Sequence, residues 1–127
     1  MTTTIGLVAH DLKKADLVKW VAAHRDQLSP HMLYATGTTG AAIEKGTGLS
    51  LHLLKSGPLG GDAQLGAMIA EEKLDMLIFF IDPLTALPHD VDVKALTRLA
   101  TLYDIPFACN RATANAVLNA LASASDA

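Results

Sequence analysis

The segment that decides the fold is Asp75-Met76-Leu77-Ile78-Phe79-Phe80-Ile81-Asp82, with six consecutive apolar residues between two aspartates. A helix that crosses a membrane needs about 20 apolar residues, so this run is too short to be one. A short apolar run bounded by polar residues is typical of a strand covered on both faces, as strands of parallel sheets are. The segment therefore predicts a buried strand of a parallel sheet.

Other apolar runs predict four further strands, at residues 5–9, 32–35, 51–54 and 107–109. The run at 51–54 contains the polar residue His52, which suits an edge strand. Helical spacing between the runs is shown by Val93, Leu96, Ala100 and Tyr103. A short helix near Thr39–Lys45 is expected to stop at Gly46. Because such strand–helix–strand units build a parallel sheet with helices on both faces, we expect an α/β fold: a three-layer α/β/α sandwich with a central, mainly five-stranded parallel sheet.

The composition predicts one domain over residues 1–127 and excludes several classes of protein. A net charge of -3 argues against a nucleic-acid partner, which a basic face would have to neutralise. A single cysteine, Cys109, fits a reducing cytosol, and the first residues lack the positive region of a signal peptide, so we expect a cytoplasmic protein without a membrane partner. Half of the residues are hydrophobic, which indicates apolar surface buried between subunits of a homo-oligomer.

The carboxyl edge of the sheet is where ligands bind in open α/β folds. Nearly every unusual polar or glycine residue follows a predicted strand, in the segments 10–14, 36–40, 56–62, 82–92 and 110–113. The opposite edge has the composition of ordinary turns. This asymmetry predicts a site at the carboxyl edge that is suited to a phosphorylated metabolite.

The segment Thr36-Gly37-Thr38-Thr39-Gly40 opens a helix after the second strand. Small residues let backbone N–H groups approach an anion, the hydroxyls add donors, and the helix N-terminus favours negative charge. Lys14 is available as a countercharge. The alternative is a helix N-cap and turn without a ligand. The placement beside a second glycine-rich loop favours the anion site.

That second loop, Ser56-Gly57-Pro58-Leu59-Gly60-Gly61-Asp62, leads into the next helix. Its three glycines and one proline specify a backbone that few other residues adopt. Asp62 then has two interpretations of equal weight. It is either an N-cap of the helix or a general base held at the sheet edge.

An acid and imidazole cluster follows the fourth strand, made of Asp82, His89, Asp90 and Asp92. A metal site is one interpretation, although no established metal-binding spacing supports it, and capping of the next helix is another. His89 is suited to act as an acid or electrophile toward a carbonyl oxygen. Cys109 is expected to be a small buried residue, Trp20 to lie in the core or a subunit interface, and no role is assigned to His24, His31 or His52.

Together these motifs resemble the methylglyoxal synthase family from about Ile5 to Thr113. The matching stretches are Ala9-His10-Asp11, Tyr34 through Gly40, Ser56 through Asp62, Asp82-Pro83-Leu84 and Pro88-His89 through Asp92. The resemblance implies a cytoplasmic homohexamer, subject to allosteric phosphate inhibition, that converts dihydroxyacetone phosphate to methylglyoxal and inorganic phosphate. It implies no cofactor and no metal.

The resemblance also implies roles for individual residues. Asp62 matches the catalytic base, and His89 matches the residue that faces the substrate's carbonyl and enediol oxygens. The supporting carboxylates are Asp11, Asp82 and Asp92. The substrate and phosphate site is implied to contain His10, Lys14, Thr36, Gly37, Thr38, Thr39, Ser56, Gly57 and His89. Three features depart from the family: no basic residue follows Arg111, Val91 replaces a usual proline, and Cys109 replaces a usual threonine.

Two other functions compete with this interpretation. The same fold serves as an effector-binding module in larger enzymes such as carbamoyl-phosphate synthetase, but a binding module needs no base such as Asp62. A metal-dependent lyase or aldolase would use His10, Asp11, His89 and Asp92, and its activity would disappear with a chelator.

Overall fold

The computed structural model describes the backbone of residues 3–84 and 90–126 and the side chains of 3–84 and 93–122. Five parallel strands form one sheet in the order β3-β2-β1-β4-β5. The strands are β1 (Thr4–Ala9), β2 (Met32–Ala35), β3 (His52–Leu53), β4 (Met76–Phe80) and β5 (Phe107–Ala108). All five lie where the apolar runs predicted them, and β3 is an edge strand as His52 suggested.

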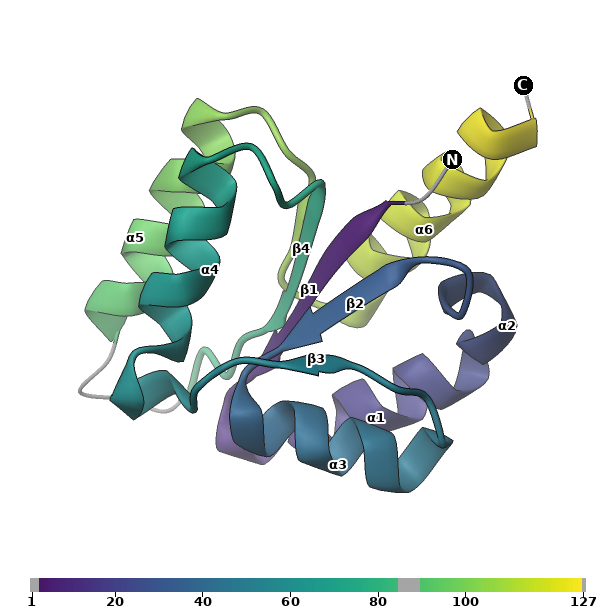
Figure 1. Cartoon of the computed structure of the whole chain (residues 1–127), viewed down its shortest axis with the longest axis horizontal. Coiled ribbons are helices and arrows are strands. Elements are labelled where there is room, and N and C mark those ends of the chain that lie inside the picture. The colour runs from purple at the N-terminus through teal and green to yellow at the C-terminus, as the bar shows by residue number, and fades with distance from the viewer. Residues whose placement is uncertain (1–2, 85–89, 127) are drawn as a thin grey trace.

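Helices cover both faces of this sheet (Figure 1). The α-helices are α1 (Lys14–Ala23), α2 (Arg25–Leu28), α3 (Gly37–Thr47), α4 (Gly61–Ala70), α5 (Asp90–Leu102) and α6 (Arg111–Asp126). Two short 3-10 helices, η1 (Asp11–Lys13) and η2 (Gly57–Leu59), precede α1 and α4. In Figure 1, α4 and α5 lie on one side of the sheet and α1, α3 and α6 on the other. The expected three-layer α/β/α sandwich is therefore confirmed.

The strand β4 joins the two halves of the core. Its residues Met76, Ile78 and Phe80 belong to the apolar cluster beneath α1, α3 and α6. Leu77 and Phe79 belong to the cluster beneath α4 and α5. Successive side chains of a strand point to opposite faces, so a run that is apolar at every position fills both layers at once. This explains why residues 75–82 carry the strongest signal for the fold.

Two details of the predicted helices are wrong. Helix α3 runs through Gly46 to Thr47 and ends at Gly48, whose φ of 76° is the left-handed conformation that glycine adopts readily. Gly46 is small for another reason, because a Cβ there would lie 2.5 Å from Cγ1 of Val18 on α1. Tyr103 lies beyond the end of α5 and is 37% exposed, so it does not extend that helix's buried face. Trp20 is buried in the core.

His31 gives the fold a pH-dependent contact just before β2. Its Nδ1 accepts a hydrogen bond from the Thr3 backbone N–H at 3.1 Å, and burial lowers the pKa of the imidazole. The unfolded chain therefore takes up a proton at this site at higher pH than the folded chain does. The free energy of unfolding should decrease as the pH falls below about 6.5 toward the lower folded-state pKa.

The His31→Asn variant keeps an acceptor but cannot be protonated. Urea unfolding at pH 7.5 and 5.5 should show a larger loss of stability for the wild type than for this variant. Equal losses in the two proteins would mean that His31 does not carry the pH dependence.

In the part of the chain that the structure describes, no helix has the length and apolar character needed to cross a membrane.

Candidate active site

A small cavity opens at the carboxyl ends of β1 and β2 and extends under η2 and the start of α4. Its volume is about 90 Å³. Eight of the residues singled out from the sequence line it: His10, Asp11, Lys14, Thr36, Thr38, Thr39, Gly57 and Asp62. The three loops that carry them follow different strands, so the parallel topology is what brings them together.

The other predicted site residues lie beside this cavity or outside the described part. Gly37 and Ser56 stand against each other, since a Cβ on Gly37 would come within 3.3 Å of the Ser56 nitrogen. Asp82 is buried beside His10, as described below. His89 and the side chains of Asp90 and Asp92 lie outside the described residues.

His10 directly follows β1 and is a buried imidazole in a fixed orientation. Its Nδ1 accepts a hydrogen bond from the Asp82 backbone N–H at 2.9 Å, and its ring meets the Phe79 ring edge-on at 5.1 Å. When Nδ1 is an acceptor, the neutral imidazole carries its proton on Nε2. The backbone at the end of β4 thus makes the Nε2 atom of His10 a hydrogen-bond donor.

Lys14 brings a positive charge to the mouth of the cavity. Its ammonium lies 2.8 Å from Oδ1 of Asp11 and donates to Oγ1 of Thr38, also at 2.8 Å. These contacts join the start of α1 to the first turn of α3. The Lys14 side chain is only 25% exposed, whereas that of Asp11 is 92% exposed. Asp11 therefore holds Lys14 in place from the solvent side.

The N-terminus of α3 faces the same cavity. Thr36 is its N-cap residue in an extended conformation, and its side chain and that of Thr39 are buried. An 11-residue helix carries a partial positive charge at this end, where backbone N–H groups lack partners within the helix. With Lys14 beside it, this end of α3 is suited to bind an anion such as a phosphate group.

The glycine-rich loop holds Asp62 over the cavity. Gly60, with a φ of 109°, is the N-cap of α4, so Asp62 lies in the first turn and the N-cap interpretation of Asp62 is wrong. Its carboxylate oxygens lie 3.5 and 3.6 Å from the place that a Cβ on Gly57 would occupy. Glycine at position 57 therefore leaves room for this carboxylate, and the positive end of α4 favours its negative charge.

The loop is packed tightly behind Asp62. Ser56 O accepts hydrogen bonds from Leu59 N–H and Gly61 N–H, at 3.0 and 2.9 Å. A Cβ on Gly61 would overlap the Lys55 carbonyl oxygen and lie 2.9 Å from Cγ2 of Thr36. Only glycine lets α4 start this close to the end of β2. The position of Asp62 is thereby tied to that of the α3 N-terminus.

A metal centre finds no support among the described side chains. No group of three or more histidine, cysteine, aspartate or glutamate residues within that part of the chain lies close enough to hold a metal ion. The predicted cluster of Asp82, His89, Asp90 and Asp92 lies mostly outside the described side chains. Cys109 is only partly buried, and burial raises the pKa of its thiol, which keeps the thiol protonated near neutral pH.

Four residues of the cavity wall were not assigned to the site from the sequence: Val8, Ala9, Pro58 and Phe79. Pro58 lies within the glycine-rich loop and was interpreted only as a backbone constraint. Phe79 belongs to the apolar run of β4, and such a run gives no sign of which member borders a ligand.

Comparisons with known proteins agree on one family. A family model described as the MGS-like domain matches residues 16–109. The methylglyoxal synthase of Yersinia enterocolitica serotype O:8 is 57% identical over 115 residues, which cover 91% of this chain and 76% of that protein. The methylglyoxal synthase of Leptospira interrogans serovar copenhageni is 59% identical over 115 residues, covering 91% and 78%. The crystal structure of methylglyoxal synthase from Elizabethkingia anophelis NUHP1 superposes with a TM-score of 0.88 at 54% identity, covering 92% of this chain and 77% of the other.

Proposed function

The chain belongs to the methylglyoxal synthase family, and on that premise we propose how its described residues act on dihydroxyacetone phosphate. The enzyme is a carbon–oxygen lyase that converts this triose phosphate to methylglyoxal and inorganic phosphate. One observation carries the assignment of the site. A carboxylate and an anion-binding helix terminus with its lysine border the same cavity of about 90 Å³. A triose phosphate needs both a base and a phosphate site within a few bond lengths of each other.

Asp62 is the base in this proposal. The substrate's hydroxymethyl C–H is acidic because the carbon lies next to the carbonyl. Asp62 takes that proton, and the electron pair of the C–H bond forms the C=C bond of an enediolate. The support for this role is the position of Asp62 above Gly57, at the edge of the cavity that Lys14 and Thr38 border.

His10 supplies a donor for the negative charge that develops on the carbonyl oxygen. Its proton is on Nε2, because Nδ1 accepts from the Asp82 N–H. A neutral donor that is already oriented stabilises an enediolate without losing free energy to reorganisation. By the family resemblance His89 faces the same oxygens, and Asp82 then acts by positioning His10.

Phosphate leaves in the second step. The enediolate hydroxyl gives up its proton, which ends on the departing phosphate, and the O–H electron pair forms a new aldehyde C=O bond. The C=C bond shifts by one position, and the C–O(phosphate) bond breaks with its electron pair on the phosphate. This gives the enolate of methylglyoxal, which takes up a proton on carbon to give the product. The breaking bond must stand perpendicular to the enediolate plane, and we assign that orientation to the α3 N-terminus with Lys14. A complex with a stable hydroxamate mimic of the enediolate should show the phosphate out of plane, and an in-plane phosphate would refute the assignment.

The reaction is tested directly by release of methylglyoxal and phosphate from dihydroxyacetone phosphate. The expected result is equal release of the two products, unchanged when a chelator is present. Activity that disappears with the chelator and returns with a metal ion would instead favour the metal-dependent lyase. No release would favour the effector-binding module.

Loss of the Lys14 charge should weaken substrate binding. The Lys14→Ala variant should raise KM about tenfold or more, because hydrogen bonds to charged groups contribute about 1.5–3 kcal/mol. Its kcat should change less, as is typical when ground-state binding is lost. The matched control is Lys45→Ala, which removes an exposed lysine near the far end of α3. A KM that is equal in Lys14→Ala and wild type would exclude Lys14 from the phosphate site.

We also propose that the enzyme is a cytoplasmic homohexamer. Large apolar side chains exposed on the single chain support an assembly that would cover them: Leu12, Leu53, Leu59, Leu84 and Leu102 are all between 48% and 94% exposed. Light scattering coupled to size-exclusion chromatography should give six times the chain mass.

A further inference from the structure

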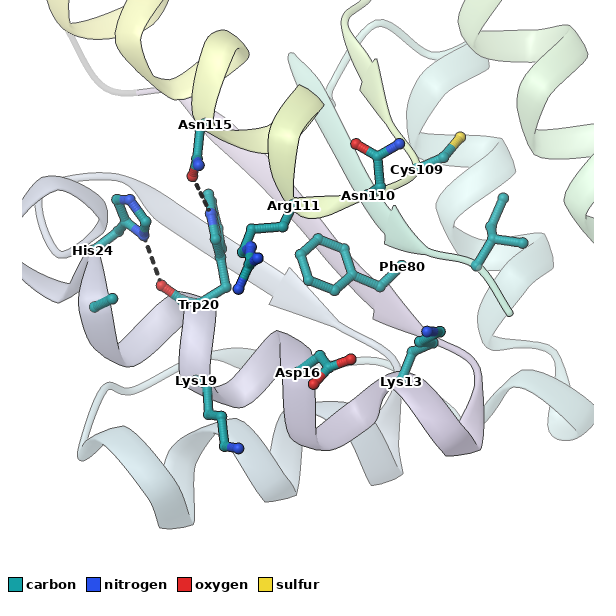
Figure 2. Close-up of a pocket in the computed structure, with 12 residues that line it drawn as sticks. Lys13, Asp16, Lys19, Trp20, His24, Phe80, Cys109, Asn110, Arg111 and Asn115 are labelled. Carbon is teal, nitrogen blue, oxygen red and sulfur yellow. Dashed lines mark hydrogen bonds between the residues drawn. The ribbon is translucent and has the colours of Figure 1, made fainter. Parts of the chain in front are cut away.

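A second and larger cavity lies between α1 and the start of α6. Its volume of about 410 Å³ is within the range of small-molecule sites and far exceeds that of the catalytic cavity. Figure 2 shows its wall, with Lys13 of η1, Asp16 and Trp20 of α1, and Arg111 of α6 around one space. The proposed reaction uses none of these residues.

Positive charge predominates around this cavity. Lys13, Lys19 and Arg111 line it, and Asp16 is the one acid among the lining residues. Within the described residues, neither Lys13 nor Arg111 makes an ion pair. This concentration of charge is unusual in a chain whose net charge is -3. A site with two cations that lack a protein counter-ion attracts an anionic ligand.

The chemistry of the donors favours a phosphate group. Arg111 is the first residue of the 16-residue helix α6, and its guanidinium has the planar donor geometry that binds phosphate in a bidentate manner. Asn110 caps that helix, since its Oδ1 accepts from the Thr113 N–H at 2.9 Å. The N-terminal end of α6 therefore adds its partial positive charge beside Arg111.

The floor of the cavity is apolar and rigid. Trp20 and Phe80 line it, with ring centroids 6.2 Å apart, and both are buried in the core. The Trp20 indole N–H donates to Oδ1 of Asn115 at 2.8 Å, and the His24 ring lies 4.7 Å from the indole (Figure 2). These contacts fix the indole before any ligand binds, so a ligand with an apolar group meets a preformed surface.

We propose that this cavity is a second ligand site, which binds a small phosphate monoester. Lys13 and Arg111 bind the phosphate, and the apolar part of the ligand covers the floor formed by Trp20 and Phe80. The site is separate from the catalytic cavity because the two share no lining residue, yet both border the segment from η1 into α1. It is independent of the proposed reaction.

Phenyl phosphate is a suitable probe, because it has a phosphate, a flat apolar group and no carbonyl to enolise. Calorimetric titrations should be made in the Lys14→Gln background, which weakens phosphate binding in the catalytic cavity. One phenyl phosphate should bind per chain. Adding Lys13→Gln and Arg111→Gln should weaken this binding at least about tenfold. The matched control is Lys94→Gln, which removes an exposed lysine of α5 on the other side of the sheet and should leave the affinity unchanged.

Inorganic phosphate, titrated in parallel, should bind more weakly than phenyl phosphate. Equal affinities would show that the apolar floor plays no part and would overturn the assignment of a monoester. Binding that is absent, or unaffected by the Lys13 and Arg111 changes, would overturn the site itself. The Lys13→Gln/Arg111→Gln variant with Lys14 intact should keep the wild-type kcat and KM for dihydroxyacetone phosphate. If the double variant folds poorly, the single variant Arg111→Gln takes its place in the titration. It should show a smaller loss of affinity for phenyl phosphate.

Discussion

Replacement of Asp62 by asparagine is expected to lower kcat by about 10²- to 10⁴-fold, the usual cost of losing a general base. Asparagine has nearly the same shape as aspartate, so the space over Gly57 stays filled and α4 should begin at the same place. Its amide cannot accept the substrate proton. Binding of a hydroxamate mimic of the enediolate, measured by calorimetry, should therefore persist while turnover is lost.

The matched control for this change is Asp26→Asn, which alters an exposed aspartate in α2, away from both cavities. It should keep wild-type turnover. Near wild-type activity of Asp62→Asn would show that another group takes the proton. Loss of analogue binding together with turnover would instead assign Asp62 a role in holding the substrate.

Replacement of Gly61 by alanine should have the second largest effect, and it should act through the backbone. The new methyl group would overlap the Lys55 carbonyl oxygen and press on Thr36, so the loop between β3 and α4 must move. Overpacking of this kind costs about 3 kcal/mol, which corresponds to roughly 10 °C in Tm for a chain of this size. Because the same loop places Asp62, a displacement of about 1 Å should also lower kcat about 10²-fold.

Gly66→Ala is the control for that experiment, since Gly66 lies in the same helix. A Cβ there would lie 3.2 Å from Cδ1 of Leu99, the flexible end of a side chain that can shift. Alanine is also the better helix former by about 1 kcal/mol, so the stability should change little. If Gly61→Ala and Gly66→Ala had the same Tm and the same kcat, the close approach of α4 to Lys55 would have no energetic consequence.

The strands could be predicted from the sequence because burial on both faces leaves a signature at every position. The apolar runs located all five strands and the edge position of β3. Helix ends were predicted less well. The end of α3 was placed at Gly46, whose lack of a side chain instead makes room for Val18 of α1. A contact between residues this far apart in the sequence gives no local signal.

The sequence predicted which loops form the site, but it did not predict the individual hydrogen bonds and contacts within it. Parallel topology brings the segments after β1 and β2 to one edge, and eight of the predicted residues do line one cavity. The tautomer of His10 depends on the register of β1 against β4, which places the Asp82 N–H beside Nδ1. The sequence left open whether Asp62 is an N-cap or a general base. The structure excludes the N-cap interpretation, because the N-cap of α4 is Gly60.

The pairing of β1 with β4 has a consequence for how the chain folds. The first strand lies in the middle of the sheet, and the hydrogen bond from Thr4 N–H to Oδ2 of Asp75 spans 71 positions of sequence. During synthesis on the ribosome, one edge of β1 therefore stays open until the residues of β4 emerge. Non-local parallel pairing of this kind slows folding, because the closure entropy of a long loop is lost before the contacts form. After it emerges, the apolar segment of β4 is exposed as an aggregation-prone strand until it pairs with β1, so we expect the nascent chain to bind chaperones at that stage.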